Sequence, residues 1–196
     1  MANKQPNILV IMADQVAAQA LSIYGNGVCK TPNLDKLAAK SVVFDNAYTP
    51  SPLCAPARSS LMTGCLGPNI GVYDNASELA ADRPTIPHFL GHLGYHSVLC
   101  GKMHFVGPDQ IHGFNERITT DIYPANFSWM PNWERGPSFI SSGVTLSSVM
   151  EAGPCVRNMQ MDYDDEVEFA ARRWWIDRGR DRAGGDDAPF CLVASF

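Results

Sequence analysis

The residues best suited to chemistry in this chain lie around one cysteine. In residues 51–64, SPLCAPARSSLMTG, Cys54 is followed by Pro56 and Arg58, and then by an apolar run of helical character that ends at a glycine. Backbone N–H groups at a helix start favour an anion or a thiolate, and Arg58, one turn later, can fold back over the same place. The pattern therefore predicts a reactive or anion-binding cysteine. A small buried cysteine beside a helix-capping proline is the structural alternative.

Three histidines form a second, weaker candidate. His88 and His92 lie four residues apart on a predicted helix and could bind zinc together, with His96 a little further on. Gly94 separates His96 from that helix, and no cysteine or aspartate completes a tetrahedral set. A half-buried helix face is therefore the preferred interpretation of these histidines, with zinc as the alternative.

Aromatic side chains gather in a region without helical or strand periodicity. Phe127, Trp129 and Trp133 could form an aromatic box for a quaternary ammonium group, because a cation is attracted to the face of an aromatic ring. Packing within a loop is the structural alternative. The following residues 138–153 are poor in the aromatic and polar groups that would complete such a pocket, so both interpretations stay open.

Alternating strand and helix patterns must position these residues. Strands are predicted at 7–12, 41–48, 95–100 and 189–196, of which the first and last are apolar throughout, as in strands buried on both faces. Helices are predicted after the N-cap Thr31, from Thr85 to the cap Gly94, and over 162–176. This alternation predicts an α/β fold, mainly a parallel sheet sandwiched by helices, with an irregular insertion at about 121–153.

Composition and charge limit the class of protein. The chain has 196 residues, 45% of them hydrophobic, which is enough for one packed core. A net charge of -5 without a basic stripe argues against nucleic acid as a partner. The apolar run 8–13 is too short to span a bilayer and lacks a cationic lead, so we predict neither a membrane segment nor a signal peptide. Six cysteines without regular spacing predict reduced thiols and a cytoplasmic protein.

Four ordered segments resemble the sulfatase family of the alkaline phosphatase superfamily. They are PNILVIMADQ (6–15), KTPNLDKLA (30–38), SPLCAPARSSLMTG (51–64) and GYHSVLCGKMHF (94–105). The core LCAPAR, GVYDNA (71–76) and MDYDDEV (161–167) resemble choline sulfatases in particular. The resemblance covers nearly the whole chain and implies an alkaline-phosphatase-like fold. Because the last predicted strand runs to the final residue, we expect this fold to be incomplete here and more sequence to follow Phe196.

The resemblance also implies a mechanism. Cys54 is similar to the cysteine that a separate maturation enzyme, reading Cys-x-Pro-x-Arg, oxidises to formylglycine. One hydroxyl of the hydrated aldehyde would attack sulfur, and the other would then expel sulfate. Arg58 would hold the formylglycine. Lys102 would hold a sulfate oxygen and His104 would assist proton transfer, their side chains pointing the same way on an extended chain.

A divalent metal follows from the same resemblance. Asp14 matches the family's N-terminal ligand for Ca²⁺ or Mg²⁺, and Gln15 and the residue at position 54 would be further ligands. The metal would lower the pKa of the attacking hydroxyl and neutralise the sulfate. Many sulfatases carry Asp-Asp where this chain has Asp-Gln, a pair that the related phosphonate monoester hydrolases share. Trp129 and Asn75 are the implied substrate contacts if the substrate is choline sulfate.

These inferences predict a hydrolase of small-molecule sulfate esters. Hydrolysis of phosphonate monoesters or phosphodiesters is one alternative, and an inactive truncated fragment that acts as a binding module is another. The family's later metal ligands and a second lysine are absent from this sequence. We therefore expect activity to need the remaining C-terminal part, and the complete protein to be a homo-oligomer.

Overall fold

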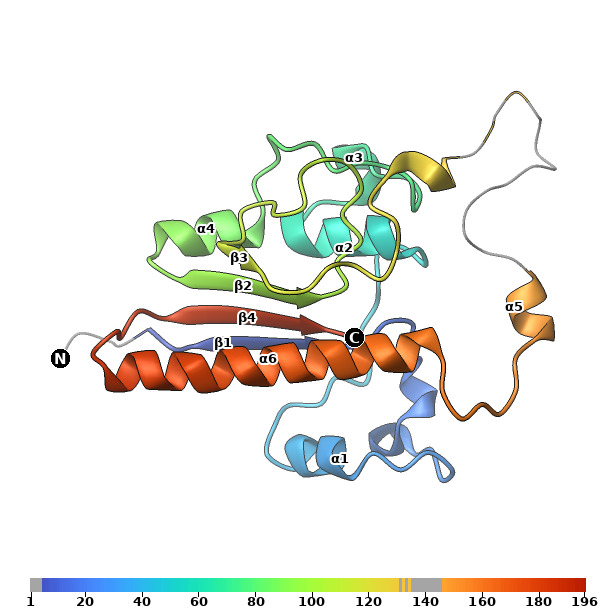
Figure 1. Cartoon of the computed structure of the whole chain (residues 1–196). Helices are drawn as coiled ribbons and strands as arrows, with labels where there is room; N and C mark the ends of the chain where they lie inside the picture. The colour runs from blue at the N-terminus through green and yellow to red at the C-terminus, as the bar shows by residue number, and fades with distance from the viewer. Residues whose placement is uncertain (1–4, 131, 133, 135–145) are drawn as a thin grey trace. The chain divides into compact units, whose positions relative to one another are not determined.

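The computed structural model describes residues 5–130, 132, 134 and 146–196 (Figure 1). It divides into two compact units. The larger comprises Met1–Met12 and Pro50–Phe196, and the smaller comprises Ala13–Thr49.

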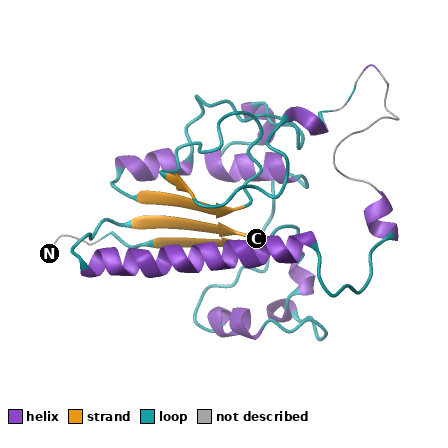
Figure 2. Cartoon of the chain, in the orientation of Figure 1, coloured by secondary structure: helices purple, strands orange, loops and turns teal. Residues whose placement is uncertain are grey.

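A sheet of four parallel strands forms the centre of the larger unit. Its order is β1-β4-β2-β3, and the strands are β1 (Ile8–Met12), β2 (His96–Gly101), β3 (Glu116–Arg117) and β4 (Phe190–Ser195). The predicted strands at 7–12, 95–100 and 189–196 are confirmed, as is the parallel sheet. The last strand in the sequence, β4, lies between β1 and β2, as the labels in Figure 1 show; Figure 2 draws the strands of the same view in orange.

Helices cover both faces of this sheet (Figure 1). On one face lie α2 (Cys54–Thr63), α3 (Gly67–Ile70) and α4 (Ile86–His92), and on the other lies α6 (Met159–Ala183). Alternate strand residues face opposite sides, so Leu99 and Val193 pack in the core beneath α2, whereas Val98 and Leu192 pack against Val167 of α6. The predicted sandwich is confirmed.

The predicted ends of α4 are confirmed, whereas α6 extends beyond the predicted range 162–176 at both ends. Thr85 caps α4 in a capping box with His88, and Gly94 follows the helix at φ 81°. The 25-residue α6 begins before 162 because the side chain of Asn158 accepts from the amide of Met161 at 2.9 Å. Among the described residues, no helix is both long and apolar enough to cross a membrane.

Two strand predictions need correction. Residues 41–48 form no strand, and Val42 and Phe44 are exposed. Their β-branched and aromatic side chains favour a sheet only where a neighbouring strand is available. Strand β1 was predicted to be buried on both faces, yet Leu9 and Ile11 are exposed. The reason is that α6 packs on β2 and β4 and leaves that face of β1 uncovered within the larger unit.

The smaller unit contains η1 (Ala18–Ala20), η2 (Ser22–Tyr24) and α1 (Pro32–Ala38). Helix α1 has the predicted proline in its first turn. Thr31 does not cap it with its side chain, because that hydroxyl pairs with Ser22 instead. In the predicted insertion at 121–153, the described residues contain the turn η3 (Phe127–Trp129) and the helix α5 (Leu146–Met150) as regular structure.

Candidate active site

Cys54 is the first residue of α2, as the motif predicts. Its thiol is half-buried. The side chain of Asn75 accepts a hydrogen bond from the amide of Ala55 at 3.0 Å and so satisfies one N–H group of the helix start. Gly64 ends the helix at φ 68°. Cys54 therefore lies at a fixed helix N-terminus, where the dipole favours negative charge.

Arg58 is buried and joins three elements of the larger unit. Its Nη1 donates to the carbonyl oxygen of Lys102 at 2.6 Å and to the hydroxyl of Ser195 at 2.8 Å. Helix α2 is thereby tied to the carboxyl ends of β2 and β4. Ser195 was not predicted as a site residue, although its place at the carboxyl end of a buried parallel strand is a signal for one.

Lys102 lies beside Cys54. Its side chain is buried, and Nζ lies 3.4 Å from the Cys54 sulfur and 4.2 Å from the centre of the Tyr123 ring. The preceding Gly101 has φ 97°, and a Cβ there would stand 1.9 Å from the carbonyl oxygen of Ser195. Only glycine permits this approach of β2 to β4. The structure thus brings two predicted residues, Cys54 and Lys102, into contact.

His104 reaches the same region by a route that the sequence did not predict. Its φ is 56°, so the chain turns left-handed there and is not extended. The extended chain expected from Lys102 to His104 is therefore wrong at His104, while the shared direction of the two side chains stays a prediction. The buried ring of His104 lies with its centre 5.4 Å from the rings of Tyr123 and of Trp129. Lys102 and His104 consequently share the neighbour Tyr123.

The ring of His104 is neutral at ordinary pH. Burial is the main cause that lowers its pKa from 6.5 to about 4. The carboxylate of Asp121 opposes this lowering, whereas the positive charges of Lys102 and Arg58 add to it. Within the described residues the ring nitrogens make no hydrogen bond of normal distance and angle, although the nearby backbone of Asn75 also raises the pKa. A neutral buried imidazole of this kind can accept or relay a proton.

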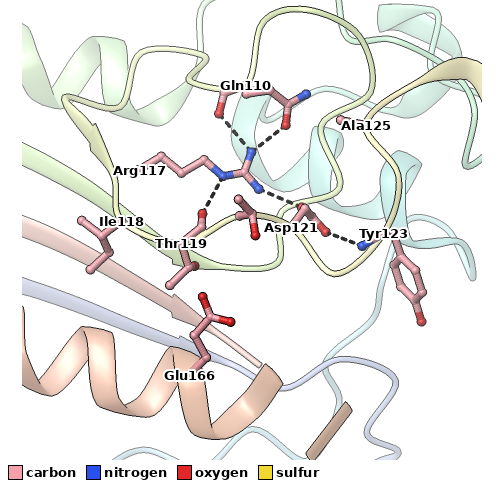
Figure 3. A pocket seen from close by; sticks show the side chains of 9 residues that line it. Gln110, Arg117, Ile118, Thr119, Asp121, Tyr123, Ala125 and Glu166 are labelled. Atoms are coloured by element: carbon pink, nitrogen blue, oxygen red, sulfur yellow. Dashed lines mark hydrogen bonds and ion pairs between the residues drawn. The ribbon is translucent and has the colours of Figure 1, made fainter. Parts of the chain in front are cut away.

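Asp121 and Tyr123 were missed by sequence reasoning. Both line an open pocket of about 600 Å³, together with Gln110, Arg117 and Glu166 among others (Figure 3). Asp121 accepts a hydrogen bond from the amide of His104 at 2.6 Å. The Tyr123 ring contacts both the Lys102 ammonium and the His104 ring. The only available signal was that both residues open the irregular stretch.

The predicted substrate contacts have defined neighbours. Trp129 packs edge-on against His104 and lies 5.0 Å from the Tyr123 ring centre. Asn75 is buried beside the start of α2. Trp133, the other tryptophan of the suggested aromatic box, falls outside the described residues. Contact of Trp129 or Asn75 with a substrate stays a prediction.

The predicted metal ligands Asp14 and Gln15 directly follow β1 and open the smaller unit. Gln15 has φ 54°, a conformation that is costly for a residue with a Cβ and that concentrates at functional sites. Their oxygens are of the type that Ca²⁺ or Mg²⁺ prefers. Within the described part of the chain, however, no three His, Cys, Asp or Glu side chains are grouped to hold a metal ion. These donors alone do not fill a coordination sphere.

The histidines of the zinc alternative have separate partners. His88 pairs with the hydroxyl of Thr85 at 2.9 Å at the start of α4. His96 pairs with Glu116 at 2.6 Å across β2 and β3. The two interactions lie on different elements and do not form a zinc site, and the expected partly buried helix face is wrong for His88 and His92, which are both exposed on α4.

Comparisons with known proteins find similar sequences over the part of the chain that holds this site. The sequence profile described as Sulfatase matches residues 6–180. Choline-sulfatase of Rhizobium meliloti is 46% identical over 197 residues, covering 100% of this chain and 38% of that protein. N-acetylglucosamine-6-O-sulfatase of Bacteroides thetaiotaomicron is 33% identical over 155 residues, covering 76% of this chain and 26% of that protein.

One solved structure has a similar fold. Phosphonate monoester hydrolase of Agrobacterium radiobacter superposes with a TM-score of 0.63 and 26% identity, covering 98% of this chain and 40% of that one. The fold is thus the alkaline-phosphatase-like sheet and helix architecture that the sequence predicts. In each of these comparisons the chain spans less than half the length of the protein that it matches.

Proposed function

The chain belongs to the sulfatase family, and from this premise we propose that it carries the nucleophile-bearing part of a hydrolase that cleaves sulfate esters. The observation that carries the proposal is the 3.4 Å contact between Lys102 Nζ and the Cys54 sulfur at the N-terminus of α2. It puts a buried cation next to the one residue that the motif marks as reactive.

The charges around Cys54 suit a sulfate ester. The helix N-terminus and the Lys102 ammonium both favour an anion, and Arg58 adds a third positive charge one turn further along α2. Charge on the sulfate oxygens grows as sulfur is attacked, so fixed cations stabilise the transition state more than the ground state. Lys102 would contact the reacting group because it already contacts the side chain at position 54.

His104 would carry out proton transfer at the reacting groups. A neutral imidazole can take a proton from an attacking hydroxyl or return one to the leaving alcohol. The pKa of about 4 keeps the ring unprotonated above that pH, so that it is free to accept a proton. Its contacts with Tyr123 and Trp129 fix the ring plane.

Formylglycine at position 54 is part of the proposal. The Cys54, Pro56 and Arg58 pattern that a maturation enzyme would read is present. The modified residue would supply a hydrated aldehyde, one hydroxyl of which attacks sulfur while the other releases sulfate. An unmodified Cys54 would instead support the alternative of an inactive binding module.

A divalent cation, Ca²⁺ or Mg²⁺, completes the proposal. Asp14 and Gln15 would supply oxygen ligands, and the strained backbone of Gln15 supports a functional role for this corner. Residue 54 as a further ligand stays a prediction from the sequence. The remaining ligands would come from the part of the relatives' length that this chain does not span.

Choline sulfate is the proposed substrate, on the strength of the similarity to choline-sulfatase and of the aromatic neighbours Tyr123 and Trp129. A phosphonate monoester is the second candidate, favoured by the similarity to phosphonate monoester hydrolase and by the Asp14-Gln15 pair. A cytoplasmic location and a homo-oligomeric assembly are further proposals that rest on the sequence.

Intact-mass analysis of the full-length protein, followed by substitution of Cys54, tests this function. We expect Cys54 to have lost its sulfhydryl mass. We expect Cys54→Ala to abolish hydrolysis of choline sulfate and to leave the thermal midpoint almost unchanged. Cys65→Ala, at an exposed cysteine of the same unit, is the control and should stay active. Activity of Cys54→Ala within a few-fold of the parent would overturn the assignment of the nucleophile.

A further inference from the structure

A carboxylate far along the chain holds the backbone at His104. Oδ2 of Asp121 accepts from the amide of Met103 at 2.9 Å and from that of His104 at 2.6 Å. The same oxygen lies 3.0 Å from Nη2 of Arg117, and the Asp121 side chain is only 4% exposed. The carboxylate is shielded from solvent, and two of the three partners of Oδ2 are amides of one short segment, residues 103–104.

The segment needs such support. A left-handed backbone is unfavourable for a residue with a Cβ. Buried amides without an acceptor would add a further cost. An ionised acceptor makes shorter and stronger bonds to amides than a neutral one does. Asp121 therefore compensates for the unusual backbone of His104.

The turn decides where the reactive side chains lie. At φ 56° the ring of His104 lies against Tyr123 and Trp129, and Tyr123 is also the ring that Lys102 Nζ contacts. Asp121 also accepts from the amide of Tyr123 at 3.3 Å through Oδ1. One carboxylate thus fixes both the imidazole and the phenol against which it packs.

Arg117 fixes the carboxylate in turn (Figure 3). Its Nη1 donates to the side-chain oxygen of Gln110 at 2.7 Å and to its carbonyl at 3.2 Å, and its Nε donates to the carbonyl of Thr119 at 3.2 Å. With the guanidinium held on three sides, Asp121 has one stable orientation. The chain of contacts runs from Gln110 through Arg117 and Asp121 to His104.

We propose that Asp121, locked by Arg117, is a positioning residue of the active site, and that it acts through the backbone of Met103 and His104 without touching the substrate. This inference rests on the proposed function, because it assumes that His104 and Lys102 serve the reaction at position 54. A positioning role differs from a purely structural role in one measurable respect. Loss of Asp121 should lower the rate of the chemical step by more than the loss of stability accounts for.

The chain offers a matched control. Asp109 makes the same pair of bonds at another left-handed histidine, accepting from the amides of Ile111 and His112 at 3.0 Å each. His112 has φ 41°, and neither Asp109 nor His112 contacts Cys54 or Lys102 in any interaction described above. Asp109→Asn therefore disturbs an equivalent turn outside the candidate site.

The experiment compares Asp121→Asn, Asp121→Ala and Asp109→Asn in the full-length matured protein with choline sulfate. Asp121→Asn should lower kcat about 10- to 100-fold and leave KM within a few-fold, because a small misplacement of reacting groups costs that much. Asp121→Ala should lower kcat further, and Asp109→Asn should leave it within a few-fold. NMR titration of the ring should show the pKa of His104 falling in Asp121→Asn, since the carboxylate that raises it has lost its charge.

Thermal midpoints separate the two roles. If Asp121→Asn and Asp109→Asn lose similar stability and kcat falls equally in both, Asp121 is structural only and the proposal is overturned. A parent protein that hydrolyses no sulfate ester would count against the proposed function instead. In that case a crystal structure of Asp121→Ala decides the inference. A ring of His104 still packed on Tyr123 with positive φ would overturn it, and a displaced ring would support it.

Discussion

Two buried histidines of the larger unit, His104 and His112, share one local design. Each adopts a left-handed backbone, at φ 56° and 41°, and the amide of each donates a hydrogen bond to an aspartate. Each ring is almost fully buried and packs on an aromatic neighbour, which for His112 is Phe105 at 4.3 Å. Burial lowers the pKa of both rings.

The aspartate comes from a different place in each case. Asp109 precedes His112 by three residues and forms a local turn, and its second oxygen lies 3.3 Å from the His112 ring. Asp121 follows His104 by seventeen residues, and both of its oxygens bond backbone amides. The ring of His104 is left facing Tyr123 and two nearby cations. With the local Asp109, the turn places the His112 ring beside its own aspartate. With the distant Asp121, the turn directs the His104 ring toward Tyr123 instead.

The largest expected effect is on catalysis. His104→Ala should lower kcat for a sulfate ester by about 10²- to 10⁴-fold, the usual contribution of a positioned acid or base. His112→Ala should lower stability through the cavity that it leaves, but keep kcat within a few-fold. Steady-state kinetics beside denaturant unfolding of the full-length protein measure both. Similar kcat losses in the two variants would contradict the difference in role between His104 and His112.

Alanine substitutions at two glycines close in sequence to these histidines should lower stability to different extents. Gly101→Ala and Gly113→Ala both put a Cβ at positive φ, but their new contacts differ. At Gly101 the Cβ meets the Ser195 carbonyl at 1.9 Å, inside the sheet, whereas at Gly113 it meets the His88 ring at 2.5 Å. A side chain can move and a central strand cannot. We expect Gly101→Ala to cost about 3 kcal/mol or more in the free energy of unfolding, and Gly113→Ala about 1–2 kcal/mol.

The pH dependence of stability tests the neutral state of the buried His104 ring. In the unfolded chain His104 takes a proton as pH falls through 6.5, but in the folded protein it does so only near 4. Its contribution is therefore complete above 6.5 and is lost as pH falls toward 4, amounting to about 3 kcal/mol at most. His104→Gln should flatten the acid loss of stability measured by urea midpoints between pH 7 and 4.5. A steeper loss in the variant than in the parent would contradict the neutral buried ring.

The smallest expected effect concerns substrate choice beside His104. A trimethylammonium group over an indole face gains about 0.5–2 kcal/mol, which corresponds to roughly 2- to 30-fold in kcat/KM. Trp129→Ala should therefore cost choline sulfate more than a neutral aryl sulfate by that factor. Trp175→Ala, on α6 against Phe190, should affect both substrates equally. Equal losses with Trp129→Ala would show that this tryptophan only packs against His104.

Local patterns were sufficient to predict the sheet and its helices. The apolar runs at 7–12 and 189–196 and the capped helix after Thr85 each carry their own signal, so they are confirmed. Residues 41–48 have the same kind of signal and form no strand, because composition cannot say whether a partner strand is near.

The site was predictable only as far as its motifs extend. The placing of Cys54 at a helix start followed from the order of residue types, and Lys102 was found through the family resemblance. The direction of His104 was not predictable, because its φ depends on Asp121 in a stretch without periodicity. The partnership of Arg58 with Ser195 spans 137 residues, and no short-range pattern encodes such a distance.

The central place of β4 has a consequence for synthesis of the chain. Strands β1 and β2 pair with each other only through β4, which begins at residue 190, whereas β2 ends at residue 101. A ribosome adding about 5–20 residues per second takes roughly 4–18 seconds to make the 89 residues between these positions (190 − 101). During that time the growing chain has no Ser195 to receive Arg58, and the segment around Cys54 lacks its tie to the sheet. The maturation enzyme proposed above would have those seconds in which to read this segment before it is buried.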